Sequence, residues 1–199
     1  MIDPPKPIEE LEGMGDDRWL SIFAQAIFSA GFNWKVVRNK WPGFEDAFDG
    51  FDVGRVAMMN DEWFDRLLSD TRVIRNGAKL RSVQENAVFF QELAEAHGSA
   101  AKAFANWPNT EYASLLETMK KRGSRLGGTT AQYALRFAGR DGYILSNDVV
   151  ARLVAEAVID KAPTSRKALG QVQDAFNAWS EQSGRGLTEI SRVLAMSAG

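Results

Sequence analysis

Apolar residues recur along this chain at intervals of three and four positions, the spacing of one helix face. The pattern begins after Asp17, where apolar side chains recur from Trp19 to Ile27 until Gly31 interrupts them. It is longest between Ala78 and Ala96, with Leu80, Val83, Ala87, Phe90 and Leu93 on one face. Alternating runs typical of strands are almost absent. The chain is therefore predicted to be all-α, with roughly ten helices joined by tight turns.

Shorter helices are expected where a capping residue or a proline precedes an apolar pattern. Asn33 is expected to cap a helix that carries Trp34 and ends before Pro42. The other expected ranges are 42–48, 53–59, 61–69, 108–122, 129–138, 147–159, 164–182 and 187–196. Residues 1–16, rich in Pro, Glu and Gly, are expected to form an extended N-terminal arm, and residues 17–199 a single domain.

The segment from Gly123 to Ala131 gives the clearest indication of a ligand. It combines a tight turn, a following threonine and nearby cations: Gly127, Gly128, Thr129, Lys120, Lys121, Arg122 and Arg125. A glycine-rich turn at a helix N-terminus offers free backbone N–H groups and the positive end of the helix dipole. This arrangement favours binding of a nucleic-acid phosphate. The alternative is an ordinary helix stop, with Gly127 in the left-handed conformation.

Aromatic residues are dense around the predicted helix stop at Gly31. Phe32 is a candidate wedge for a gap in a base stack, and Trp34 a candidate face for an extruded base. The alternative is that both rings belong to the core. Trp41 and Phe44, a few residues further on, are expected in the core.

Two further segments carry charges at predicted helix starts. The turn from Ile74 to Arg81 contains Lys79 and enters a helix, so it is a candidate second phosphate site. The alternative is a surface turn whose basic side chains are solvated and bind no ligand. Asp148, one helical hairpin after the glycine turn, is a candidate carboxylate facing a reacting sugar. The alternative is that Asp148 is a capping or first-turn acid, which the helix dipole favours without any catalytic role.

Charge and composition limit the classes of function. The net charge is −2, which argues against a nonspecific polyanion-coating protein but allows a local basic patch. The chain has no cysteine and one histidine, His97, which excludes disulfides, thiolate metal sites and a His-based metal cage. No apolar run reaches membrane-spanning length and the N-terminus lacks the apolar core of a signal peptide. We expect a cytoplasmic protein that uses no cofactor or metal and contacts no membrane.

Taken together, these segments resemble the 3-methyladenine DNA glycosylase I family of the helix-hairpin-helix superfamily. The matching pieces occur in family order over about residues 19–155, and the combination is specific although each piece alone is not. They are Ala30-Gly31-Phe32-Asn33-Trp34, Phe48-Asp49-Gly50-Phe51-Asp52, Val56-Ala57, Ile74-Arg75-Asn76-Gly77-Ala78-Lys79, Asn86-Ala87, Lys121-Arg122-Gly123, Gly128-Thr129-Thr130 and Asn147-Asp148-Val149-Val150.

The resemblance implies a bilobal all-α fold with a cleft between two lobes. The hairpin at 126–130 would anchor double-stranded DNA, while an alkylated purine would rotate into a pocket containing Trp34. Hydrolysis of the N-glycosidic bond of N3-alkylated adenine or a related purine would follow, by a monomer without cofactor. The implied base contacts are Trp34, Phe32 and Trp19, and the implied backbone contacts are Lys79, Lys121, Arg122, Arg125, Gly127, Gly128 and Thr129.

The chain departs from the family pattern at three places. The family usually carries a zinc site of two cysteines and two histidines, which this composition cannot supply. Ala26 occupies the position of the family's pocket glutamate. The superfamily's catalytic aspartate aligns with Asn147, which leaves Asp148 one residue late. These departures motivate one alternative, a noncatalytic DNA- or lesion-binding module. A helical protein-interaction scaffold is the other.

Overall fold

The computed structural model describes residues 4–197, and within that range it contains helices and no strand. The prediction of an all-α chain is confirmed. The α-helices are α1 (Ile8–Gly13), α2 (Asp16–Ser29), α3 (Trp34–Ala47), α4 (Val53–Ala57), α5 (Asp61–Ser69), α6 (Gly77–His97), α7 (Ala100–Asn106), α8 (Tyr112–Arg122), α9 (Thr129–Ala138), α10 (Asn147–Ala155), α11 (Arg166–Ser183) and α12 (Leu187–Met196). Two short 3₁₀ turns, η1 (Asp49–Phe51) and η2 (Asn109–Glu111), complete the set. No helix among residues 4–197 is long and apolar enough to cross a membrane.

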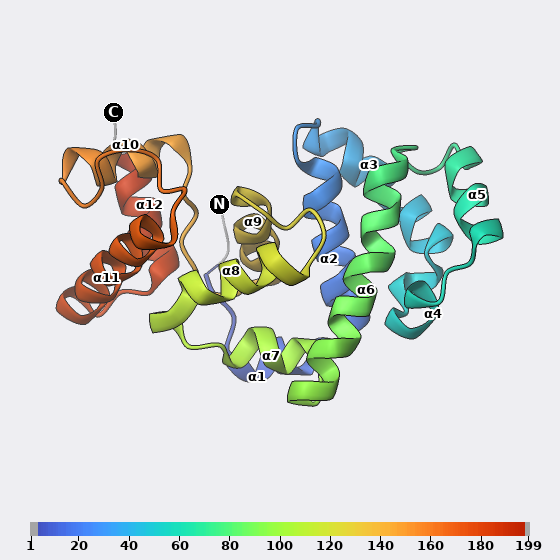
Figure 1. Ribbon diagram of the computed structural model, residues 1–199, viewed down its shortest axis with the longest axis horizontal. Helices are drawn as coiled ribbons and strands as arrows, with labels where there is room; N and C mark the ends of the chain where they lie inside the picture. The colour runs from blue at the N-terminus through green and yellow to red at the C-terminus, as the bar shows by residue number, and fades with distance from the viewer. Residues whose placement is uncertain (1–3, 198–199) are drawn as a thin grey trace.

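The long helix α6 runs through one side of the molecule, with α2 and α4 near it (Figure 1). Helix α4 packs along α6, and α2 packs against both α6 and α9. Helices α10, α11 and α12 gather at the opposite end, beyond α8 and α9 (Figure 1). The core beneath α2 is aromatic: Phe23 lies 5.3 Å from Phe90 and 5.0 Å from Phe104 between ring centroids. Burial of such rings supplies the main driving force for helix packing.

The N-terminal segment is more ordered than the sequence suggests. Residues 8–13 form α1 instead of an extended arm, because Leu11 is buried against α7. The Lys6 amide also donates to the Gly139 carbonyl at 2.9 Å. Helix α7 itself was not predicted; it is short and alanine-rich, and Ser99 caps it by accepting from the Lys102 amide. Both helices depend on contacts that are distant in sequence.

Helix α3 continues through Pro42, where the sequence analysis expected one helix to end and another to begin. A proline inside a helix costs about 3 kcal/mol because it lacks an N–H and crowds the preceding turn. Two buried residues of α3, Val37 and Phe44, flank the proline. Phe44 packs 4.6 Å from Phe28 of α2 and 4.7 Å from the Trp41 ring. This continuous packing outweighs the proline penalty.

Hydrogen bonds of the buried Gln173 and the half-buried Asp141 hold the last two helices against the rest of the molecule. The side chain of Gln173 on α11 accepts from the Ala113 amide at 2.7 Å and donates to the Asn109 carbonyl at 3.1 Å. The carboxylate of Asp141 accepts from the amides of Leu187 and Thr188 at 3.0 and 2.8 Å, which caps the start of α12. The amides of Ala113, Leu187 and Thr188, which lie in first helical turns and lack an intrahelical acceptor, are thereby satisfied.

Replacing Asp141 by alanine removes the cap of α12 and should lower the free energy of unfolding by about 1–2 kcal/mol. Urea denaturation monitored by circular dichroism measures this difference. Asp160→Ala is the control, because Asp160 is exposed in the segment between α10 and α11. The control should stay within about 0.5 kcal/mol of the parent. Equal stability of the two variants would contradict the capping role of Asp141.

Candidate DNA-binding hairpin and base-binding surface

Helices α8 and α9 enclose a tight turn whose shape requires glycine at two positions. A Cβ on Gly123 would lie 2.6 Å from the Leu126 side chain and 2.8 Å from the Met119 carbonyl oxygen. Gly128 has φ 58° and ψ −136°, a conformation essentially confined to glycine. The glycine expected in the left-handed region, Gly127, is not among the positive-φ residues. The backbone of this turn therefore differs from the simple helix stop with a left-handed Gly127.

The turn is fixed to α6 by one buried amide side chain. Asn86 donates from Nδ2 to the Ser124 carbonyl at 2.9 Å, and its Oδ1 accepts from the Ser124 amide at 2.8 Å. Asn86 is 1% exposed, so water does not compete for these bonds. Leu126 is also buried and anchors the turn from below. The tip of the turn is thus held rigidly while its outer residues remain exposed.

The start of α9 offers backbone donors toward solvent. Gly128 is the N-cap residue and has no side chain that could accept a capping hydrogen bond, whereas the Thr130 amide donates to the Gly127 carbonyl at 3.3 Å. Gly128 and Thr129 are exposed. Uncapped N–H groups at a helix N-terminus, with the positive end of the dipole, favour an anionic oxygen. The predicted role of Gly127, Gly128 and Thr129 in binding a phosphate stays a prediction.

The cations around the turn differ in their availability. Lys121 pairs with Glu117 at 2.7 Å, and Arg122 pairs with Glu92 at 2.8 Å while lying over the Phe89 ring. The hydrogen bond from Lys121 is the main reason that the pKa of Glu117 is lowered. Within residues 4–197, Lys120 and Arg125 have no carboxylate within 4.0 Å, and both are exposed. Among the cations beside the turn that were predicted to contact the DNA backbone, Arg125 therefore has no described ion pair to break.

The aromatic loop lies between α2 and α3. Gly31 turns the chain with φ 69°, and the Asn33 side chain caps α3 by accepting from the Lys35 amide at 2.9 Å. This cap places Trp34 in the first turn of α3. Phe32 is 47% exposed and Trp34 37% exposed. The two rings expected at a base-binding surface are therefore accessible, unlike Phe44, which is buried as expected.

Two aromatic residues that the sequence analysis did not select pack against Trp34. Phe137 of α9 lies 4.8 Å from the indole with an interplanar angle of 79°, and Tyr133 lies 5.8 Å from it at 65°. Phe137 is itself 43% exposed. The four-residue spacing on α9 was the available signal, although the same spacing is typical of core residues. The three rings form an aromatic surface beside the hairpin.

Trp19 has a different environment from the one expected of a base contact. Its side chain is fully buried, 5.2 Å from the Phe104 ring, and its Nε1 donates to the Leu11 carbonyl at 3.2 Å. The structure therefore places Trp19 in the core instead of at a base-binding surface. Ala26 is also buried on α2. The periodic pattern of α2 did not distinguish a pocket wall from a core face, because both are apolar.

The segment after α9 places Asn147 and Asp148 in different surroundings. The Ser146 side chain caps α10 by accepting from the Val149 amide. Asn147 lines a cavity of about 660 Å³ together with Gly128 and Thr129, whereas Asp148 is exposed and does not line it. This follows from the rotation of about 100° between successive helix residues. The cavity lies between α8, α9, α10 and α11.

Lys79 is half-buried, and its ammonium group binds main-chain carbonyls of the protein itself. Its Nζ donates to the carbonyls of Phe28 and Ala30 at 3.2 and 2.8 Å. Burial, with a smaller contribution from the charge of Arg125, lowers the pKa of Lys79. To bind a phosphate as predicted, the Lys79 ammonium would have to give up these hydrogen bonds to main-chain carbonyls.

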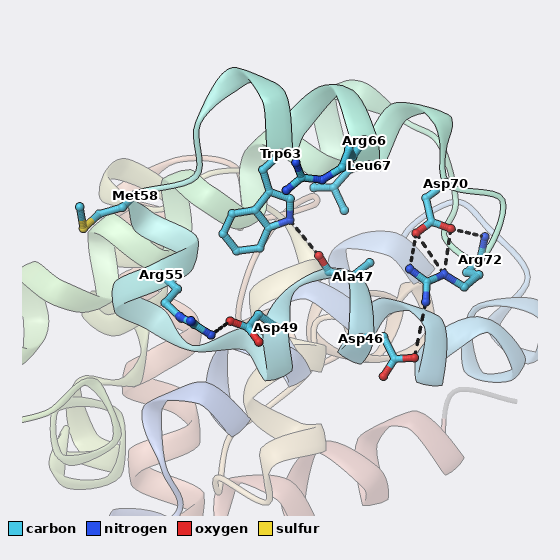
Figure 2. A pocket seen from close by; sticks show the side chains of 10 residues that line it. All are labelled: Asp46, Ala47, Asp49, Arg55, Met58, Trp63, Arg66, Leu67, Asp70 and Arg72. Atoms are coloured by element: carbon cyan, nitrogen blue, oxygen red, sulfur yellow. Dashed lines mark hydrogen bonds and ion pairs between the residues drawn. The ribbon is translucent and has the colours of Figure 1, made fainter.

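A second cavity of about 660 Å³ lies away from the predicted site residues, between the end of α3, α4 and α5 (Figure 2). The Trp63 indole forms part of its wall and donates to the Ala47 carbonyl at 2.9 Å. Its rim charges are paired, Arg55 with Asp49 and Arg72 with Asp46 and Asp70 (Figure 2). This balance leaves no excess of either sign to select a charged ligand.

The residues present do not fit the zinc site of the resembled family. Among residues 4–197, no group of three or more His, Cys, Asp or Glu side chains is positioned to hold a metal ion. The sequence contributes no cysteine and a single histidine. The C-terminal helices are instead held to the preceding segments by hydrogen bonds that the side chains of Gln173 and Asp141 accept from the amides of Ala113 and Leu187.

Comparison with known proteins shows the family. A family model described as methyladenine glycosylase matches residues 14–121, and the chain belongs to this family. DNA-3-methyladenine glycosylase 1 of Escherichia coli (strain K12) is 28% identical over 124 residues, which cover 53% of this chain and 66% of the relative. The family match includes the aromatic loop and α8 but ends before the turn at 123–128.

Solved structures share the fold, and one of them does so over nearly the whole chain. 3-Methyladenine DNA glycosylase I from Staphylococcus aureus superposes with a TM-score of 0.57 at 22% identity, covering 63% of this chain and 77% of that chain. An 8-oxoguanine glycosylase/lyase from Methanocaldococcus jannaschii, solved in complex with a 15mer DNA, has a TM-score of 0.52 at 15% identity. That match covers 94% of this chain and 85% of that chain. The chain therefore shares the helical fold of these solved glycosylases.

Replacing Asn86 by alanine should release the turn from α6 and lower the free energy of unfolding by about 1–3 kcal/mol, because the Ser124 amide and carbonyl lose their buried partner. Amide hydrogen exchange at residues 123–128 should accelerate beyond the change expected from global stability alone. Ser82→Ala is the matched control on the same buried face of α6, since Ser82 bonds only to the Lys79 carbonyl. Equal exchange in both variants would contradict the anchoring role.

Proposed function

We propose that this protein is a DNA glycosylase that removes N3-alkylated adenine, or a related alkylated purine, during base excision repair. The observation that carries the proposal is that one helix, α9, bears both the candidate phosphate site and the rings that contact Trp34. Its exposed, uncapped N-terminus adjoins the hairpin, and its next two turns contact the accessible Trp34 indole. The family membership and the DNA-bound relative support the same assignment.

In this proposal the hairpin holds one DNA strand. A phosphate oxygen accepts hydrogen bonds from the amides of Gly128 and Thr129, and Arg125 adds an exposed positive charge. Lys121 and Arg122 reach the backbone only by leaving their glutamate partners. Such contacts fix the position of the duplex without reading its sequence. Phe32 lies on the neighbouring loop and supports the gap that a rotated nucleotide leaves.

The target base leaves the stack and lies against Trp34, which Tyr133 and Phe137 hold from the side. N3-alkylation gives the base a positive charge, and a cation over an indole is favourable by electrostatic attraction to the ring. A normal, uncharged adenine lacks this attraction. The aromatic surface thereby selects the damaged base over its normal counterpart.

The chemistry needs little acid catalysis. When the glycosidic bond breaks, its electron pair goes to the base and neutralises the positive charge there. The sugar becomes an electron-poor cation, which water attacks at C1′ with loss of a proton. The protein's task is to hold the rotated nucleotide and favour positive charge on the sugar. Asp148, exposed in the first turn of α10, is the proposed carboxylate for that charge.

A second candidate function is a noncatalytic module that binds damaged DNA. The buried alanine at position 26, where the resembled family has a glutamate, favours it. This module would use the same hairpin and aromatic surface. Release of free base distinguishes the two functions directly, and salt-dependent DNA binding separates both from a protein-interaction scaffold.

Incubation with methylated duplex DNA should release 3-methyladenine, detected by chromatography. Trp34→Ala should slow release by about tenfold, because stacking on an aromatic side chain contributes about 1–3 kcal/mol per base. Trp63→Ala is the control, since this half-buried indole lies on α5 in the other cavity. No release by a folded parent that still binds DNA would exclude the enzymatic function and leave the noncatalytic module.

Arg125→Gln should weaken binding to duplex DNA and make the dependence of log K on log salt concentration less steep by about 0.9, the contribution of one phosphate contact. The exposed Lys102 of α7 provides the control, as Lys102→Gln should leave the slope unchanged. Fluorescence anisotropy at several salt concentrations measures both. An unchanged slope in Arg125→Gln would place the duplex on another surface.

A further inference from the structure

The ammonium of Lys79 is directed at the end of α2, immediately before the loop that carries Phe32 and Trp34. Its two acceptors, the carbonyls of Phe28 and Ala30, belong to the last turn and cap of α2, where carbonyls have no intrahelical donor. A cation at this position also complements the negative end of the helix dipole. The Lys79 ammonium lies 6.0 Å from the centre of the Phe28 ring.

The other hydrogen bonds that the structure describes for this loop are local. The Ala30 amide donates to the Ala26 carbonyl, and the Phe32 amide to the Ser29 carbonyl. The Asn33 side chain accepts from the Lys35 amide. Lys79 is 49 positions from Ala30 in sequence. It therefore connects the loop to α6, the helix to which Asn86 also fixes the hairpin.

We propose that Lys79 is a positioning residue, which sets the aromatic surface of Trp34 relative to the hairpin and does not itself bind a phosphate. The inference rests on the proposed function for the identity of the base, and on the hydrogen bonds alone for the position of the loop. Replacement of Lys79 by methionine keeps the aliphatic stem and removes both hydrogen bonds. Lys79→Arg keeps a cation that donates to the same carbonyls.

The first test uses the protein without DNA. The chain has six tryptophans, so 5-fluorotryptophan labelling gives six ¹⁹F resonances, and Trp34→Phe identifies that of Trp34. In Lys79→Met the Trp34 resonance should shift or broaden while those of the other tryptophans stay in place. Lys79→Arg should restore it, and the exposed control Lys102→Met should leave it unchanged. A Trp34 resonance identical to the parent's in Lys79→Met would overturn the proposal.

The second test separates positioning from phosphate binding. A positioning role predicts that Lys79→Met weakens binding of free 3-methyladenine by about tenfold, because a disturbed loop misplaces the stacking ring. It also predicts an unchanged salt dependence for duplex binding. A phosphate contact predicts the reverse: unchanged affinity for the free base and a salt slope less steep by about 0.9. That second pattern would overturn the proposal.

The two proposals fail in different ways. If the parent protein releases no base and binds no 3-methyladenine, the proposed function is wrong, and the ¹⁹F spectra still decide whether Lys79 positions Trp34. If the parent releases 3-methyladenine and Lys79→Met matches it in base affinity and spectrum, the function stands and the positioning role is wrong.

Discussion

Two hydrogen bonds between the Asn86 side chain and the main chain of Ser124 hold the hairpin against α6, and the proposed DNA interface depends on them. Seven residues earlier on the same helix, Lys79 holds the end of α2. At 1.5 Å per residue, the two attachment points are about 10 Å apart along a rigid helix. Helix α6 thereby fixes the spacing between the turn that would grip phosphate and the loop that would receive a base.

Helix α9 makes the second connection between these features. Thr129 opens it at the hairpin, Tyr133 lies one turn later, and Phe137 one turn beyond. Both rings contact Trp34, so movement of the hairpin relative to the indole would disturb packing on α9. Because packed helices resist small deformations, α9 holds the hairpin and the Trp34 surface in one fixed arrangement. If the proposed function is right, this preorganisation would reduce the cost of binding a rotated nucleotide.

Local sequence signals predicted the elements that local physics determines. Periodic apolar residues located most helices, and the cap at Asn33 follows from a short polar side chain that accepts a backbone hydrogen bond. The turn between α8 and α9 was also recognisable, because its conformation depends on glycines that are close together in the sequence. Helices α1 and α7 and the continuation of α3 through Pro42 were not, because packing between distant segments stabilises them. Secondary structure that relies on such contacts leaves little periodic signal.

The residues of the candidate site likewise differ in how far local sequence could identify them. Phe32 and Trp34, for which the sequence left a base contact and a core position open, are exposed in the structure, and their role as base contacts stays a prediction. Trp19, selected by family likeness, is buried in the core. Periodicity cannot separate these cases, since an apolar helix face serves a pocket or a core equally well. Tyr133 was overlooked for the same reason. The acceptors of Lys79 lie about fifty residues away, and no pattern within one helix reveals them.

A crystal structure with duplex DNA containing an abasic site, together with 3-methyladenine, tests the central claim most directly. A phosphate oxygen should lie within hydrogen-bonding distance of the Thr129 amide, and the free base should stack against Trp34 in the same complex. A duplex that contacts the cavity between α3 and α5 instead, or a base bound away from the indole, would contradict the account.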